Sequence, residues 1–132
     1  MRFMLDTNIC IYLMREQPPE VATRFAKMHV GDAVMSTITL AELRAGLERN
    51  SITRAHNAHA LDALVELVLP MPFDSKAADA FGAMPVSANR RRDALDRLIA
   101  AHAISLDVPL VTNNAADFRG FPGLKVENWV RA

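Results

Sequence analysis

The chain has 132 residues, of which 51% are hydrophobic and 23% are charged, and its formal net charge is zero. This length fits one compact domain, residues 1–132, and the composition excludes an intrinsically disordered chain. No apolar run is long enough to span a membrane, and no net charge exists to attract nucleic acid globally. The first residues lack the shape of a signal peptide, and the single Cys10 excludes an internal disulfide, so we expect a cytoplasmic protein.

Short strand-like runs alternate with longer helical patterns along the chain. In chain order, we predict a strand over 2–5, helices over 9–15 and 19–28, a strand over 33–36, helices over 40–49 and 54–67, a strand over 68–71, helices over 75–82 and 93–106, and strands over 110–112 and, more weakly, 124–126. Alternation of this kind predicts a parallel sheet with helices on both faces.

An aspartate follows directly after the first predicted strand. Phe3, Met4 and Leu5 form a short apolar run, and Asp6 comes next, before the helical pattern begins. The carboxyl end of a strand is the usual place for a ligand in an open α/β sheet, and an unpaired buried charge is costly there. One alternative is that Asp6 only caps the next helix. We favour a ligand site, because a cap does not require a buried strand before it.

Glu42 has a strong local alternative. Thr39 and Glu42 have the spacing of a capping box, in which the hydroxyl and the carboxylate each bond a backbone N–H at a helix start. Taken alone, this residue favours the cap. A ligand role for Glu42 depends on the other acids.

The helix predicted over 93–106 has the clearest pattern. Its apolar stripe, at helical spacing, consists of Leu95, Leu98, Ile99, His102, Ala103 and Leu106. Asp96 lies beside the stripe near the amino end of the helix, where Asp93 also lies, and acids there complement the helix dipole. The dipole explains less well why an acid borders an apolar stripe. His102 is interpreted as a packed histidine bonded to backbone rather than as a catalytic base.

A fourth acid, Asp117, follows a probable strand within the segment TNNAADF. Such loops are often only turns. Here, however, Thr112, Asn113 and Asn114 place a hydroxyl and two amides at the sheet edge where Asp6 is expected. These groups are oxygen ligands, or groups that orient water on a metal.

Carboxylates and neutral oxygen donors, without a Cys cluster or a complete His set, select Mg²⁺ or Mn²⁺ over zinc. Four converging acids would repel one another unless a cation lay between them. Such ions activate water and stabilise charge on phosphoryl oxygens, so the natural chemistry is phosphodiester hydrolysis.

The basic residues leave alternatives open. Arg90, Arg91 and Arg92 stand at the start of the late helix, either in a solvated loop or in contact with phosphate or an acidic partner. Arg97 follows Asp96 and is interpreted as a partner of nearby acids or as a further substrate contact. His56 and His59 are interpreted as surface residues.

Several segments resemble the PIN-domain toxins called VapC, the ribonucleases of type II toxin–antitoxin modules. They are MLDTNICIYLMR, STITLAELRAG, DRLIAAHAIS and LVTNNAADFRGFPGLKVENW, which span almost the whole chain in the right order.

The resemblance implies a three-layer α/β/α sandwich around a short, mainly parallel sheet, and cleavage of structured RNA, with tRNA the expected substrate. It implies that Mg²⁺ or Mn²⁺ is held by four acids, Asp6, Glu42, Asp96 and Asp117. It implies supporting roles for Thr7, Asn8, Thr112 and Asn113. It also implies a homodimer and inhibition by a VapB-type antitoxin, whose tail covers the active site.

The sequence departs from the family pattern in one place. Similar members often carry a glycine-containing turn before the third acid, whereas this chain reads VSANRRRDALDRL. Asp93 is therefore a further candidate ligand.

Two other functions agree less well with the sequence. A phospho-acceptor receiver domain would need a lysine near a late strand, and Lys27, Lys76 and Lys125 are not placed for that. A silent module that only binds an antitoxin would not need the full acid set.

Overall fold

The computed structural model describes residues 1–85, 94–118 and 120–130. Five short strands form one sheet: β1 (Phe3–Leu5), β2 (Ala33–Ser36), β3 (Leu69–Met71), β4 (Leu110–Val111) and β5 (Val126–Glu127). The helices are α1 (Thr7–Arg15), α2 (Pro19–Ala26), α3 (Thr37–Leu47), α4 (Arg54–Leu67), α5 (Ser75–Ala83) and α6 (Ala94–Leu106), with a short 3₁₀ helix, η2, over Ala115–Phe118.

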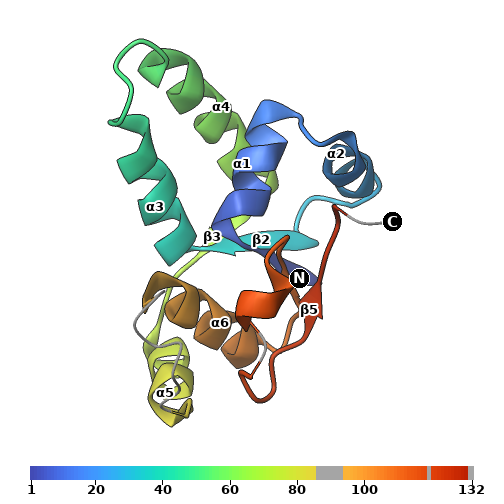
Figure 1. Cartoon of the computed structure of the whole chain (residues 1–132), viewed down its shortest axis with the longest axis vertical. Helices are drawn as coiled ribbons and strands as arrows, with labels where there is room; N and C mark the ends of the chain where they lie inside the picture. The colour runs from blue at the N-terminus through green and yellow to red at the C-terminus, as the bar shows by residue number, and fades with distance from the viewer. Residues whose placement is uncertain (86–93, 119, 131–132) are drawn as a thin grey trace.

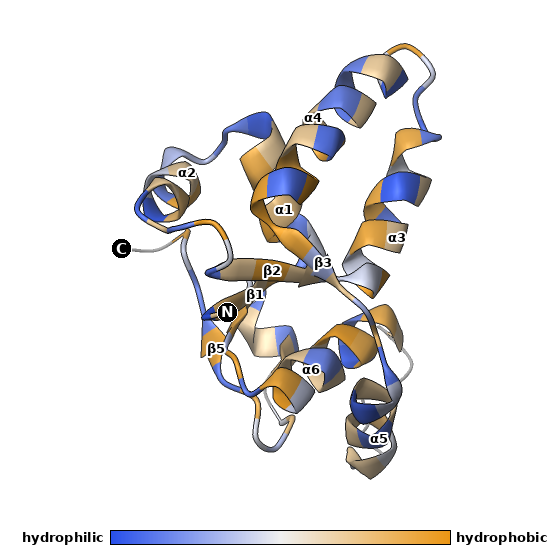
Figure 2. Ribbon diagram, turned by 180° about the vertical axis from the view of Figure 1, so that it is seen from behind, coloured by the Kyte–Doolittle hydropathy of each residue, from blue (hydrophilic) through white to orange (hydrophobic). Residues whose placement is uncertain are grey.

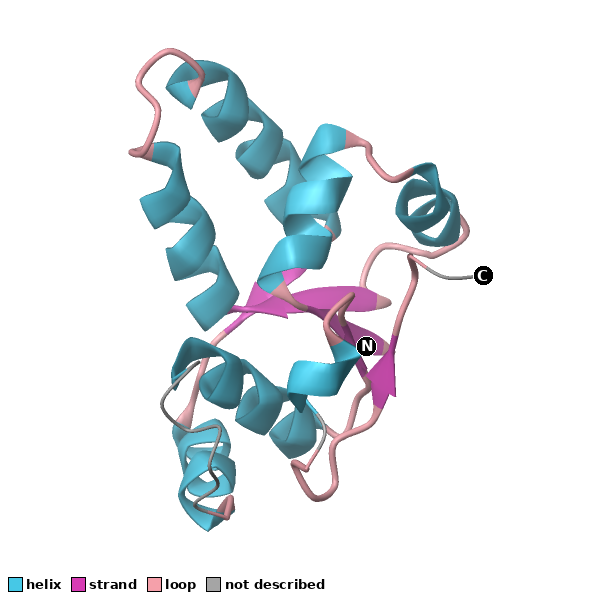
Figure 3. Cartoon of the chain, viewed as in Figure 1, coloured by secondary structure: helices cyan, strands magenta, loops and turns pink. Residues whose placement is uncertain are grey.

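The molecule has three layers, which confirms the predicted α/β/α sandwich. Helices α1 to α4 lie on one side of the sheet, and α5 and α6 lie on the other (Figure 1). Figure 3 shows how short the strands are beside the helices that cover them.

Every strand pair in the described sheet is parallel, in the order β3-β2-β1-β4-β5. The chain builds outward from β1 through β2 to β3, and then crosses back to add β4 and β5 on the other side of β1. The strand order therefore reverses between β1 and β4. In sheets of this type, ligands bind in the crevice beyond the carboxyl ends of the strands at such a point.

Alternate residues of the central strands face two separate cores. Phe3 and Leu5 of β1 belong to the cluster under α1 to α4, whereas Met4 of β1 and Val34 of β2 belong to the cluster against α6. This is the two-residue period of a strand covered on both faces. Figure 2 shows the apolar residues of α6 in orange, and the outer parts of α4 are mostly hydrophilic. The sheet is therefore covered by an apolar core on each of its two faces.

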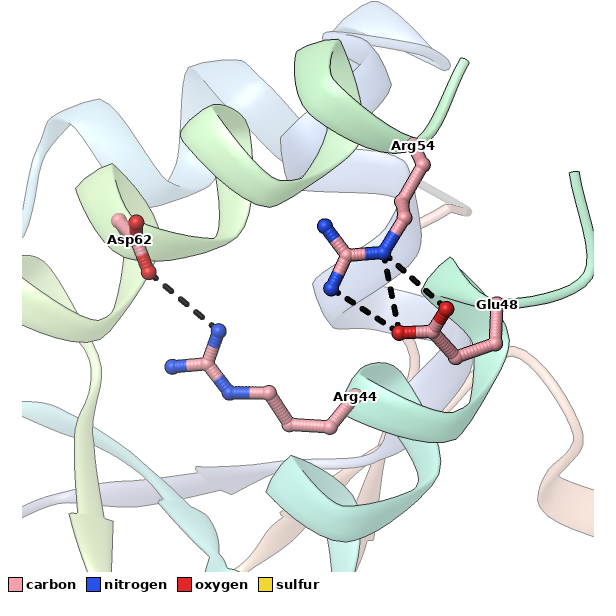
Figure 4. A network of polar contacts seen from close by, with 4 residues as sticks. All are labelled: Arg44, Glu48, Arg54 and Asp62. Atoms are coloured by element: carbon pink, nitrogen blue, oxygen red, sulfur yellow. Dashed lines mark hydrogen bonds and ion pairs between the residues drawn. The ribbon is translucent and has the colours of Figure 1, made fainter. Parts of the chain in front are cut away.

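The hairpin of α3 and α4 extends away from the sheet. Two ion pairs join its helices and the loop between them: Arg44 to Asp62 at 3.3 Å, and Arg54 to Glu48 at 3.0 Å (Figure 4). All four side chains are largely exposed, so solvent screens these pairs and they contribute little to stability. Apolar contacts at Leu43, Leu47, Leu61 and Leu64 hold the hairpin instead.

Most predicted boundaries agree with the structure to within a few residues, but one helix start differs. The helix predicted over 40–49 begins at Thr37, directly after β2, because the Ser36 hydroxyl accepts the Ile38 N–H and caps it. The last strand lies slightly later than predicted, at Val126–Glu127. Among the described residues, no helix is long and apolar enough to cross a membrane.

Candidate active site

Asp6 both caps a helix and lies at the strand-order reversal. Its backbone N–H donates to the Val111 carbonyl at 3.0 Å, which ties the end of β1 to β4. Its side chain accepts the Ile9 N–H at 2.9 Å and caps α1. The residue is only 5% exposed. The two interpretations of Asp6 are therefore compatible, because the cap uses one carboxylate oxygen in a buried position at the crevice.

Burial changes the acidity of Asp6. Loss of water raises its pKa from 3.8 to about 6, and the negative charge of Glu42 adds to this increase. Hydrogen bonds from the Thr112 side chain and from the Ile9 and Asn8 backbone oppose the shift without cancelling it. Asp6 therefore carries its charge at a cost, which a cation beside it would reduce.

Glu42 does not belong to a capping box. Since α3 starts at Thr37, Thr39 already lies within the helix and Glu42 lies a turn further along, so the predicted cap is wrong. The Thr7 hydroxyl donates to Glu42 Oε1 at 2.7 Å. This bond joins the first turn of α1 to α3 and holds Glu42 near enough to Asp6 for its charge to raise the pKa of Asp6.

Asp117 and the loop before it come from the end of β4. The Asn114 backbone N–H donates to the Thr112 hydroxyl at 2.9 Å, which closes the turn. The Asn114 side-chain amide then donates to Asp117 Oδ2 at 2.6 Å. Asn114 therefore holds the fourth acid, a role that the sequence analysis did not single out. The sequence signal for this contact was that Asn114 and Asp117 are three residues apart in a turn rich in Asn and Asp.

Asn113 has different contacts from its neighbour. Its amide donates to the Tyr12 hydroxyl at 3.4 Å, and its oxygen accepts the Asn128 amide at 3.3 Å. Neither Asn113 nor the buried Thr112 is among the residues that line the crevice, whereas Asn114 is. Thr112 acts on the site through Asp6.

A pocket of about 460 Å³ brings the predicted acids together. Its lining consists of Asp6, Thr7, Asn8, Glu42, Asp96, Asn114 and Asp117. Asp96 comes from the first turn of α6, on the opposite side of the sheet from Glu42. All four predicted acids thus line one pocket. No basic side chain is among the described residues that line it.

The donor set fits a hard divalent cation, because carboxylates, a hydroxyl and amides are oxygen ligands. The pocket is not a preformed cage. Among the described residues, no three Asp, Glu, His or Cys side chains lie close enough together to hold one ion. An ion would therefore have to draw the acids inward. The site residues agree with the expected chemistry, and the identity of the metal stays a prediction.

Arg97 is buried away from the pocket, which disagrees with the interpretation of this residue as a substrate contact. Its side chain is buried, and its guanidinium carbon lies 5.4 Å from the Phe81 ring centre and 5.9 Å from that of Phe121. Its Nη1 has no hydrogen-bond partner within the part of the chain that the structure describes. Arg97 therefore packs among aromatic rings beside α5 and is not among the pocket-lining residues. Arg90, Arg91, Arg92 and Asp93 lie outside the described residues.

His102 is packed, as predicted, but its partner is a side chain rather than backbone. Its Nδ1 lies 2.8 Å from the Ser36 hydroxyl, and burial lowers its pKa. His56 and His59 are exposed on α4, as predicted.

Comparison with known proteins places this pocket in a family. A family model described as PIN domain matches residues 3–123. The chain is 33% identical to a tRNA(fMet)-specific endonuclease VapC of Shigella flexneri, over 98% of each sequence. It is 35% identical to ribonuclease VapC2 of Haemophilus influenzae, over 98% of this chain and 99% of the relative. The chain belongs to the VapC family of PIN-domain ribonucleases.

Solved VapC-family structures share the fold over nearly the whole chain. A DNA-bound VapBC from Salmonella typhimurium matches with a TM-score of 0.83 at 30% identity, covering 98% of both chains. VapBC2 from Rickettsia felis, bound to a DNA fragment from its promoter, matches with a TM-score of 0.80 at 31% identity. These findings confirm the VapC assignment and the fold. The roles of individual side chains stay predictions.

Proposed function

We propose that this chain is the toxin of a type II toxin–antitoxin module and cleaves structured RNA with the help of Mg²⁺ or Mn²⁺. Its relatives are VapC nucleases, which supports phosphodiester hydrolysis. The observation that carries the metal requirement is the pocket itself: four acids line it, with no base among its described lining residues. Such a surface repels a phosphate unless a cation reverses its charge.

Asp6, Glu42, Asp96 and Asp117 would hold the ion. A divalent ion held there would lower the pKa of a water molecule and offset charge on phosphoryl oxygens. The chain's other groups keep the acids in place: Thr7 holds Glu42, Asn114 holds Asp117, and the Ile9 N–H holds Asp6. Asn8 is exposed at the pocket and is available to contact the substrate.

The substrate we propose is tRNA, because two relatives are named tRNA(fMet)-specific endonucleases. A tRNA substrate would place the activity in the cytoplasm. The partner we propose is a VapB-type antitoxin, because the solved relatives include VapBC complexes. We also propose a homodimer, which the family resemblance implies. Substrate contacts at Arg90, Arg91 and Arg92 remain part of the proposal.

Brief induction of the chain, followed by mapping of new 5′ ends across total RNA, tests this function. We expect growth arrest and a few discrete cuts in one RNA species. Asp6→Asn should remove both effects, because it keeps the helix cap and removes a charge. Glu66→Gln is the matched control, since Glu66 is an exposed acid on α4 outside the pocket. Induction with neither growth arrest nor RNA cleavage would favour the silent antitoxin-binding module, and the intact acid set argues against that alternative.

A further inference from the structure

A buried hydrogen bond joins the two helices that carry Glu42 and Asp96. Ser36 immediately precedes α3, and His102 lies in α6, on the opposite side of the sheet (Figure 1). Ser36 Oγ and His102 Nδ1 are 2.8 Å apart, and the two residues are no more than 1% exposed. Neither residue lines the acidic pocket. The bond therefore links the supports of two pocket acids without touching either acid.

The Ser36 hydroxyl makes two hydrogen bonds at once. The Ser36 hydroxyl oxygen already accepts the Ile38 N–H at 3.0 Å, which caps α3. The hydroxyl still has a proton to donate and a second lone pair to accept with, so it can bond His102 Nδ1 in either neutral tautomer of the ring. One hydroxyl thus completes the start of α3 and holds α6 at the same time.

Neighbouring groups keep the His102 ring in place. The Phe73 ring packs against it edge-on, with ring centres 5.4 Å apart and planes at 80°. The Phe73 N–H donates to the Thr37 hydroxyl at 3.0 Å, which anchors Phe73 to the first residue of α3. The imidazole is therefore enclosed by groups that are themselves tied to α3.

The bond between Ser36 and His102 lies at a similar distance along each helix from the pocket acid that the helix carries. Glu42 is six residues beyond Ser36, and Asp96 is six residues before His102, so each acid lies about 9 Å along its helix from the bond. A change in the relative tilt of α3 and α6 at this bond would therefore change the distance between the two carboxylates. The acids repel one another, and among the described residues no three of them lie close enough to hold one ion, so the placement of the helices sets how easily an ion gathers them.

We propose that His102 is a positioning residue for the divalent-ion site, acting through Ser36 to set the separation of Glu42 and Asp96. This inference rests on the proposed function, because it assumes that the pocket takes an ion. It assigns His102 a role in binding the ion without contact with the ion, the substrate or the acids.

Calorimetric titration of Mn²⁺ into the chelator-treated full chain tests the proposal. His102→Leu removes the bond at similar volume and should weaken Mn²⁺ binding at least tenfold, the usual size of an effect transmitted through a ligand's support. His102→Asn places an amide near the position of Nδ1 and should keep the affinity within about threefold of the original chain. The matched control is Ile99→Ala, which removes buried apolar contacts on α6 without removing a hydrogen bond.

Unfolding of each variant is measured beside its Mn²⁺ affinity. The proposal is overturned if His102→Leu binds Mn²⁺ like the original chain, or if a comparably destabilised Ile99→Ala loses as much affinity. If His102→Leu does not fold, His102→Gln replaces it, because its longer amide misses the Nδ1 position. Absence of Mn²⁺ binding by the original chain would overturn the proposed metal function as well. Normal binding by the original chain with unaffected His102 variants would overturn this inference alone.

Discussion

The Thr7 hydroxyl donates a 2.7 Å hydrogen bond to the Glu42 carboxylate, across 35 positions of sequence. Thr7 follows Asp6 directly, so the bond joins two of the four pocket acids through one residue. Because Glu42 lines the pocket, its carboxylate is positioned to meet a ligand there. A neutral donor of this kind stabilises a carboxylate without competing with a cation for it.

Thr7→Val should reduce RNA cleavage and Mn²⁺ affinity by about tenfold, because Glu42 loses the donor that orients it. Valine has nearly the same shape, so the fold should remain intact. Thr7→Ser keeps the hydroxyl and should retain most of the activity. Equal activity of the valine and serine variants would show that the bond does not orient Glu42 for catalysis.

The adjacent residues Asn113 and Asn114 offer a matched pair. Asn114→Ala removes the 2.6 Å bond to Asp117 within the pocket and should lower the cleavage rate by about tenfold. Asn113→Ala removes only the contacts to Tyr12 and Asn128 and should change the rate little. Single-turnover cleavage of a tRNA substrate measures both, and the reverse order of effects would contradict the proposed site.

Asp6→Asn should stabilise the chain in metal-free buffer at neutral pH. The folded pKa of Asp6 is about 6 and its ordinary value is 3.8. The folded state therefore binds more protons than the unfolded state between these values, and stability is lost as pH rises from about 4 to 6. Above that range the cost is about 3 kcal/mol. The asparagine variant has no buried charge, so it lacks this destabilisation, and its side chain still caps α1.

Urea unfolding at several pH values measures this effect. The stability advantage of Asp6→Asn should grow between pH 4 and 6 and then stay constant. An advantage that does not change with pH would mean that burial does not raise the pKa of Asp6.

His102 should act on stability in the opposite direction. Burial lowers the pKa of His102 below the ordinary 6.5, so His102 binds a proton more readily in the unfolded chain than in the folded chain. Stability from this group is complete above pH 6.5 and is lost as pH falls below it. In an Asp6→Asn background, this loss is no longer offset by the opposite effect of Asp6. His102→Asn in that background should flatten the pH dependence, and an unchanged slope would contradict the buried, neutral ring.

The sequence predicted the site best where local pattern and topology agree. Asp6 follows an apolar strand and precedes a helix, and both features depend on neighbouring residues. Parallel pairing then forces Asp6 and the loop after β4 to the same edge of the sheet. The acids could therefore be grouped without a structure.

The sequence was misleading where tertiary contacts outweigh local motifs. Thr39 and Glu42 mimic a capping box, but Ser36 starts the helix earlier because β2 passes directly into α3. Arg97 looked like a partner for acids, yet its stem is buried and its guanidinium lies over Phe81 and Phe121. The Ser36 cap is itself a local feature that competes with the Thr39 spacing, whereas the packing of Arg97 depends on elements that are distant in sequence.

The dependence of RNA cleavage on free Mg²⁺ tests the central claim most directly. Purified chain, freed of its antitoxin, is assayed on tRNA first in excess chelator and then with Mg²⁺ or Mn²⁺ added back. We predict no turnover in chelator, recovery with either ion, and no cleavage by Asp6→Asn at any metal concentration. Full turnover in excess chelator would contradict the account.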